Sequence, residues 1–310
     1  MTQKTLKDYL FAIQDFLKTA PLRTKVLVAC AVVLVFLLCG GLIYGINSQR
    51  QSRLHQIFAQ ASQVDSVIVD IDEVLTVALT DASIPKIEAA QKELVVAQRQ
   101  IANAIKSAEA LKKKTPKDEQ KEVELVQNSL GVREYILSVS PDLLLANLQA
   151  AQALEHADAA WTSLENGVRK SKQAQEKQAN PTRAALEESI ELNRQAQRDF
   201  STAQSALESA TAAFSEADFS PYMQYIEMSR DLATTAIEAD QLLLKKQDKA
   251  AKQAIKKYNK LSKDAAVMAH ENIVSLNSVI MAAYRIKTEA LSNQYFSARE
   301  KVSSIDKQIR

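Results

Sequence analysis

The longest apolar run in the chain covers residues 26–46, which read VLVACAVVLVFLLCGGLIYGI and contain no charged side chain. A helix needs about 20 apolar residues to cross a bilayer core, so this run is long enough to span it once. Basic residues are concentrated on its N-terminal side, at Lys4, Lys7, Lys18, Arg23 and Lys25, whereas only Arg50 and Arg53 follow closely. The positive-inside rule therefore predicts a single-pass protein of the cell membrane, with a cytoplasmic N-terminus and residues 47–310 extracytoplasmic.

A cleaved signal peptide is the alternative for the same segment. The apolar run is longer than the usual core of a signal peptide, and no A-x-A-like cleavage site follows it. We therefore predict that residues 26–46 are an uncleaved transmembrane anchor. Within it, Gly41 and Gly45 form a G-x-x-x-G spacing, which allows two membrane helices to pack closely.

The region before the span has helical spacing of its own. One face of residues 1–25 gathers the apolar side chains Leu6, Tyr9, Leu10, Ile13, Phe16 and Leu17, and Pro21 ends the pattern. This pattern predicts a cytoplasmic amphipathic helix. Such a helix lies in the membrane interface or docks a cytoplasmic partner.

Beyond the span the apolar positions follow heptad spacing, alternating steps of three and four residues. The first stripe runs from Leu54 to Ala78, and the second from Ile87 to Leu111. A third runs from Asn193 to Phe214 and a fourth from Ala251 to Met268. Alanine recurs along these stripes, which permits close packing between helices. The pattern predicts an all-α fold in which the transmembrane helix leads into a coiled-coil-like bundle or a chain of antiparallel helical hairpins.

Prolines divide this helical pattern. Pro116, Pro141, Pro181 and Pro221 each follow a residue suited to the N-cap, which predicts helix starts near these positions. Breaks are also expected at residues 81–85 and 245–249, and Asn166-Gly167 resembles a helix end. We therefore expect a membrane-proximal hairpin region at 47–139 and a distal helical bundle at 140–310. The 40-residue spacing of the last three prolines leaves open a helical repeat.

Composition supports helices and excludes several kinds of function. The chain has only five glycines in 310 residues, too few for the turns of a sheet protein. The formal net charge of +2 does not indicate a nucleic-acid-binding protein. Both cysteines, Cys30 and Cys39, fall in the apolar run, so the rest of the chain has no disulfide framework.

No pattern in the sequence indicates catalysis. The three histidines, His55, His156 and His270, are scattered over different predicted helices. The chain has no zinc-protease motif, no phosphate-binding glycine loop and no nucleophile elbow. We therefore expect a protein with no catalytic residues, no metal and no cofactor.

One charge pattern is a candidate for binding. Residues 245–263 are rich in lysine, and one helical face carries Lys249, Lys252, Lys256, Lys260 and Lys263, with Lys245 just before them. A solvated outer face is the simplest interpretation. The functional alternative is contact with an anionic lipid, a wall polymer or an acidic partner.

Taken together, these features predict a non-enzymatic scaffold or interaction protein of the cell envelope, acting through helix contacts with itself or with a protein partner. At the level of class alone, the chain resembles bacterial inner-membrane proteins with a short cytoplasmic N-terminus and a helical ectodomain. The alternative is a ligand-sensing helical bundle. Residues 1–25 are too short for an output domain, so sensing would require a partner within the membrane.

Overall fold

The computed structural model describes the backbone of residues 22–179 and 181–309. Side chains are described from residue 49 onward, except at positions 81, 118, 180, 271, 272 and 310. The described part is all helical. It comprises α2 (Leu22–Thr76), α3 (Ile84–Lys114), α4 (Gln120–Gln178), α5 (Arg183–Ala213), α6 (Ser220–Leu244), α7 (Asp248–Asn272) and α8 (Leu276–Ile309), with short 3-10 turns at Asp81–Ser83 and Lys117–Glu119.

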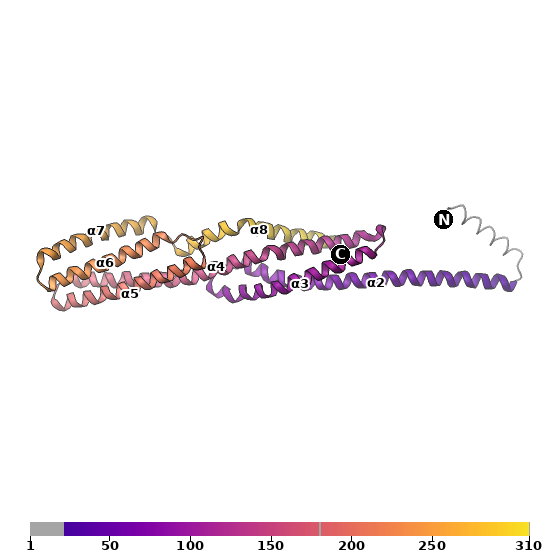
Figure 1. Cartoon of the computed structure of the whole chain (residues 1–310), viewed down its shortest axis with the longest axis horizontal. Coiled ribbons are helices and arrows are strands. Elements are labelled where there is room, and N and C mark those ends of the chain that lie inside the picture. Colours follow the sequence, from indigo (N-terminus) through magenta and orange to yellow (C-terminus); the bar gives the residue numbers. More distant parts are fainter. Residues whose placement is uncertain (1–21, 180, 310) are drawn as a thin grey trace.

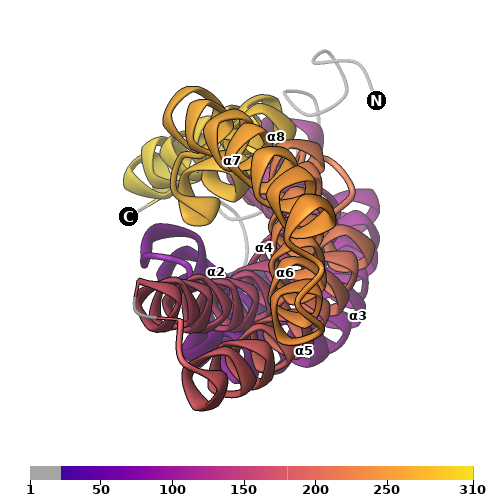
Figure 2. The same ribbon diagram turned by 90° about the vertical axis from the view of Figure 1, so that its left-hand side faces the viewer.

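The molecule is a long rod organised around α4 (Figure 1). This helix has 59 residues, so it is about 88 Å long at 1.5 Å per residue. Its first half packs with α2, α3 and α8, and its second half packs with α5. Helix α6 packs on α5, and α7 packs on α6. Viewed end-on, α7 and α8 lie on one side of the molecule and α3 and α5 on the opposite side (Figure 2).

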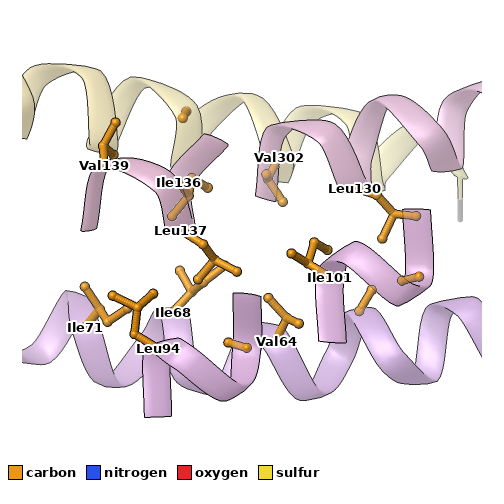
Figure 3. Packing of buried hydrophobic residues seen from close by; sticks show 14 of the residues in the cluster. Val64, Ile68, Ile71, Leu94, Ile101, Leu130, Ile136, Leu137, Val139 and Val302 are labelled. Carbon is orange, nitrogen blue, oxygen red and sulfur yellow. The ribbon is translucent and has the colours of Figure 1, made fainter. Parts of the chain in front are cut away.

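Two apolar cores follow one another along the rod. The first joins α2, α3, the first half of α4 and the end of α8, and Figure 3 shows Ile68, Ile101 and Leu137 meeting at its centre. The second joins the rest of α4 with α5, α6 and the start of α8, around Phe200, Phe214 and Tyr222. Because α4 contributes to both cores, each half of the rod is tied to the other by continuous backbone.

The predicted stripes lie on the buried faces of the helices over most of their length. All eight residues of the second stripe, from Ile87 to Leu111, are buried, and the first stripe is buried from Leu54 to Ile71. The third stripe is buried along its whole length, from Asn193 to Phe214. These apolar patterns therefore predict which side of each helix faces the core.

Two predicted helix ends are wrong. Residue 141 does not begin a helix, because α4 continues through Pro141. A proline has no N–H to donate to the carbonyl four residues earlier, which here belongs to Leu137. The side chain of Gln98 on α3 donates to this oxygen instead, at 3.0 Å. The expected boundary between residues 139 and 140 therefore falls inside a continuous helix, and the proposed division of the chain stays a prediction.

Gly167 also lies within α4 rather than at its end. A Cβ atom at this position would come within 2.5 Å of the Phe200 ring on α5. The glycine therefore allows the ring to pack directly against the α4 backbone, which is a different role from terminating a helix.

The other predicted breaks lie close to observed ones, although α2 already ends at Thr76 and α3 begins at Ile84. Residues 81–85 contain a 3-10 turn, and α6 ends at Leu244 shortly before α7 begins at Asp248. The α5 start differs slightly, because the N-cap is Thr182, whose hydroxyl accepts from the Ala185 N–H, rather than Asn180.

Within the described residues, no helix is long and apolar enough to cross a membrane. The predicted span at 26–46, with Gly41 and Gly45, falls where no side chain is described, and residues 1–21 of the predicted amphipathic helix lie outside the described chain. Both remain predictions.

Candidate functional site

The lysine-rich candidate surface lies on α7, at the end of the rod farthest from the first residues of α2 (Figure 1). Helix α7 packs against α6, and its buried positions are Ala251, Ala254 and Ala265. The structure places the predicted lysines on the opposite, exposed side of this helix or at its entrance: Lys245, Lys249, Lys252, Lys256, Lys260 and Lys263.

The lysine row has a regular geometry. Lysines three or four residues apart on a helix are separated by about 4.5–6 Å along the axis. From Lys249 to Lys263 this gives a straight row of positive charge about 21 Å long. Among the described residues, no carboxylate forms an ion pair with this row. It is therefore available to an external anion, and whether it binds one stays a prediction.

A buried carboxylate joins α4, α5 and α6 close to the start of α7. Asp240 near the end of α6 is 1 % exposed and accepts hydrogen bonds from Gln178 of α4 at 2.8 Å and from Ser189 of α5 at 2.6 Å. Burial raises the pKa of Asp240, although these two hydrogen bonds oppose the shift. The ends of α4 and α6 and the beginning of α5 are thus joined at one point, just before the lysine row.

A second polar cluster lies in the other half of the rod, where α2, α4 and α8 meet. Arg133 of α4 is 4 % exposed and pairs with Asp65 of α2 at 2.7 Å and with Asp306 of α8 at 2.6 Å. Ser129 donates to Asp306 at 2.6 Å and accepts from Arg133. Burial alone lowers the pKa of Arg133, but the two carboxylates outweigh it and raise the pKa above its usual value.

A similar arrangement follows two turns farther along α2. Asp72 pairs with Arg299 of α8 at 2.7 Å and accepts from the Tyr295 hydroxyl at 2.7 Å. Burial and this carboxylate both raise the pKa of Tyr295. The two clusters therefore join α2 and α8 through polar side chains.

An open groove of about 580 Å³ lies between α2 and α8, over these clusters. Its lining includes Asp65, Asp72, Arg133, Arg299 and Phe296. Arg133 and Arg299 in its lining are paired with carboxylates, whereas Glu300 and Lys307, which also line it, form no ion pair among the described side chains. The paired groups connect α2, α4 and α8 across the groove.

Sequence reasoning missed both clusters, although a signal was present. Asp65 and Asp72 are seven residues apart and follow the stripe residues Val64 and Ile71, so they repeat at one heptad position beside the core. Arg133 itself occupies a position of the apolar spacing, three residues after Leu130 and four before Leu137. Charged residues at regular positions beside a seam indicate interhelical pairing.

The histidines do not come together. His55 lies on α2, His156 on α4 and His270 on α7. In the side chains that the structure describes, no group of three or more His, Cys, Asp or Glu residues is arranged to hold a metal ion. The expectation that no metal or cofactor binds stays a prediction.

Comparison with known proteins gives no family for this chain: no protein-family model matches it, and no curated protein or solved structure is significantly similar. The fold by itself defines a class, which is an elongated all-helical rod with two successive cores.

Proposed function

We propose that this protein is a non-enzymatic, membrane-anchored helical spacer of the cell envelope. Residues 26–46 cross the membrane, residues 47–310 form a rod outside it, and the lysine row on α7 meets an anionic partner at the far end. Each part of the proposal has a separate structural or sequence basis.

The proposal rests on the position along α2 at which the packed bundle ends. Arg50 of α2 forms an ion pair with Glu119, immediately before α4 begins, so the bundle ends at the level of residue 50. Helix α2 continues past this level to Leu22, and none of the other described helices lies beside this part (Figure 1). The unaccompanied part contains the apolar run of residues 26–46, and a lipid bilayer is the environment that favours such a sequence.

A continuous helix also explains how the rod is attached to its proposed membrane anchor. Helix α2 has 55 residues without an interruption, so the predicted span and the first core share one rigid element. The buried part of α2, from Leu54 to Ile71, begins eight residues after Ile46, about 12 Å along the axis. This arrangement supports a rod that stands off the membrane.

The length of α4 sets the distance at which the rod acts. Its first residue lies next to the Arg50 pair, and its last residue, Gln178, contacts Asp240 just before the lysine row. The beginning of α7 is therefore about 88 Å from the level of residue 50. Since electrostatic attraction in physiological salt is screened over about 8 Å, the lysine row meets an acidic protein or a wall polymer, not the anchoring membrane.

Membrane extraction tests the anchor. We expect the full chain to stay in the membrane pellet after alkaline carbonate washing, and added protease to digest residues 47–310 from outside intact spheroplasts. Replacing Leu34 and Leu37 by lysine should release the chain, because each charge at the bilayer centre costs about 3 kcal/mol. The matched change of both leucines to isoleucine should leave it anchored. Extraction of the unaltered chain, or complete protection from protease, would contradict the proposal.

A further inference from the structure

The turn between α3 and α4 lies beside the point where α2 leaves the bundle. Glu119 in this turn pairs with Arg50, and Leu111 at the end of α3 lines a small surface hollow with Arg53 and Ile57 of α2. Residue 50 is four residues beyond Ile46, which corresponds to about 6 Å along the helix. The turn is therefore at the level where the apolar run of α2 has just ended.

This turn presents three exposed lysines. Lys113 and Lys114 end α3, Lys117 follows in the 3-10 turn, and all three side chains are exposed. Two nearby acids are already paired, Glu119 with Arg50 and Glu124 with Lys112. In the described part of the chain, none of the three exposed lysines forms an ion pair with a carboxylate.

The turn is also held in a fixed position. Thr115 is buried at 6 % exposure and its hydroxyl donates to the Leu111 carbonyl at 2.8 Å. The Gln120 side chain donates to the carbonyls of Thr115 at 2.9 Å and Lys112 at 3.3 Å. These contacts tie the lysines to the end of the rod, so their charges keep a defined place beside α2.

We propose that Lys113, Lys114 and Lys117 contact the anionic head groups of the membrane in which α2 is anchored. The inference rests on the proposed anchor and adds a second, electrostatic contact beside it. Lysines close to a charged bilayer surface are attracted to it, whereas charges beyond a screening length of about 8 Å are not. A contact away from the α2 axis would resist tilting of the rod, which a single spanning helix does not do.

Lysine footprinting in nanodiscs tests this contact. The full chain is placed in discs of neutral phosphatidylcholine, or of the same lipid with about 30 % phosphatidylglycerol, and acetylated with an N-hydroxysuccinimide ester. Mass spectrometry then compares the reactivity of Lys113, Lys114 and Lys117 with that of Lys256 and Lys260 on α7. We expect the turn lysines to lose about threefold in reactivity in the anionic discs and to regain it in about 1 M salt.

The α7 lysines are the internal control, because they lie beyond reach of the disc. Equal reactivity of the turn lysines in both kinds of disc, in a chain that has entered them, would overturn the inference. A chain that does not enter either disc would instead contradict the proposed anchor, so the two failures are distinguishable. An equal loss of reactivity on α7 would also overturn the inference, because it would show a general effect of the anionic discs.

Matched variants give a second measurement. Replacing Lys113, Lys114 and Lys117 by glutamine removes the turn charge, and replacing Lys256, Lys257 and Lys260 by glutamine removes the same charge from α7. Native mass spectrometry counts the phosphatidylglycerol molecules that each chain retains. We expect the turn variant to retain fewer than the unaltered chain and the α7 variant to retain as many. Equal retention by both variants would contradict the contact.

Discussion

At the scale of single residues, the rod is organised by a few buried polar groups. Arg133 bridges two helices distant in sequence through Asp65 and Asp306, and Asp240 gathers the ends of three helices. Apolar side chains bury area without fixing how helices slide past one another, whereas a hydrogen-bonded pair has one favourable geometry. We infer that Arg133 sets the register of α2, α4 and α8.

Replacing Arg133 by methionine tests this role. We expect the free energy of unfolding to fall by about 2–4 kcal/mol, because Asp65 and Asp306 lose the positive charge that they share, and the fall is moderated because both are partly exposed. The control is Arg183→Met, which removes an exposed pair with Glu187 and should change the free energy by less than about 0.5 kcal/mol. Urea denaturation followed by circular dichroism measures both. Similar losses in the two variants would contradict the role assigned to Arg133.

At the scale of elements, the sequence predicts the faces of the helices better than their ends. Heptad spacing depends on many residues at once, so one exception does not change which side is buried. An end depends on one or two residues, and a contact from elsewhere in the chain can override them. Pro141 is such a case, because the hydrogen bond that it removes from the Leu137 carbonyl is supplied by Gln98, 39 residues earlier. Nothing in the local sequence around Pro141 indicates this compensation.

A double-mutant cycle tests the compensation at Pro141. Gln98→Ala should cost about 1–2 kcal/mol, because it leaves the Leu137 carbonyl without a donor. In a Pro141→Ala background the new backbone N–H takes that place, so the same change should cost much less. Gln100→Ala is the matched control, since Gln100 makes an exposed hydrogen bond with Gln63. Equal costs of Gln98→Ala in the two backgrounds would show that Gln98 does not support the helix through Pro141.

The candidate sites were predicted less completely than the fold. The lysines on α7 are visible in the sequence because their spacing puts them on one face. The lysines of the turn between α3 and α4 were not recognised as a site, since their position beside the end of the apolar run depends on the Arg50–Glu119 contact between residues 69 positions apart. Local patterns reveal a charged face, but only the packing shows what that face lies near.

At the scale of the whole molecule, two basic surfaces lie at opposite ends of the rod. The turn lysines are beside the end of the apolar run, and the α7 row begins about 88 Å away, at the other end of α4. The continuous helices α2 and α4 link the predicted span to the distal core. Helical continuity thus favours a spacer that keeps its distal surface at a fixed height.

The height of the rod above the bilayer is the quantity that tests the proposed spacer most directly. Cryo-electron microscopy of the full chain in nanodiscs should show a narrow rod projecting about 90 Å from one face of the disc, since α4 sets that length. An antibody fragment raised against α7 would mark the far end. A rod of that height with the fragment at its tip agrees with a membrane-anchored spacer. A chain that stays outside the disc, or a rod lying flat on the bilayer with the fragment at the surface, would contradict it.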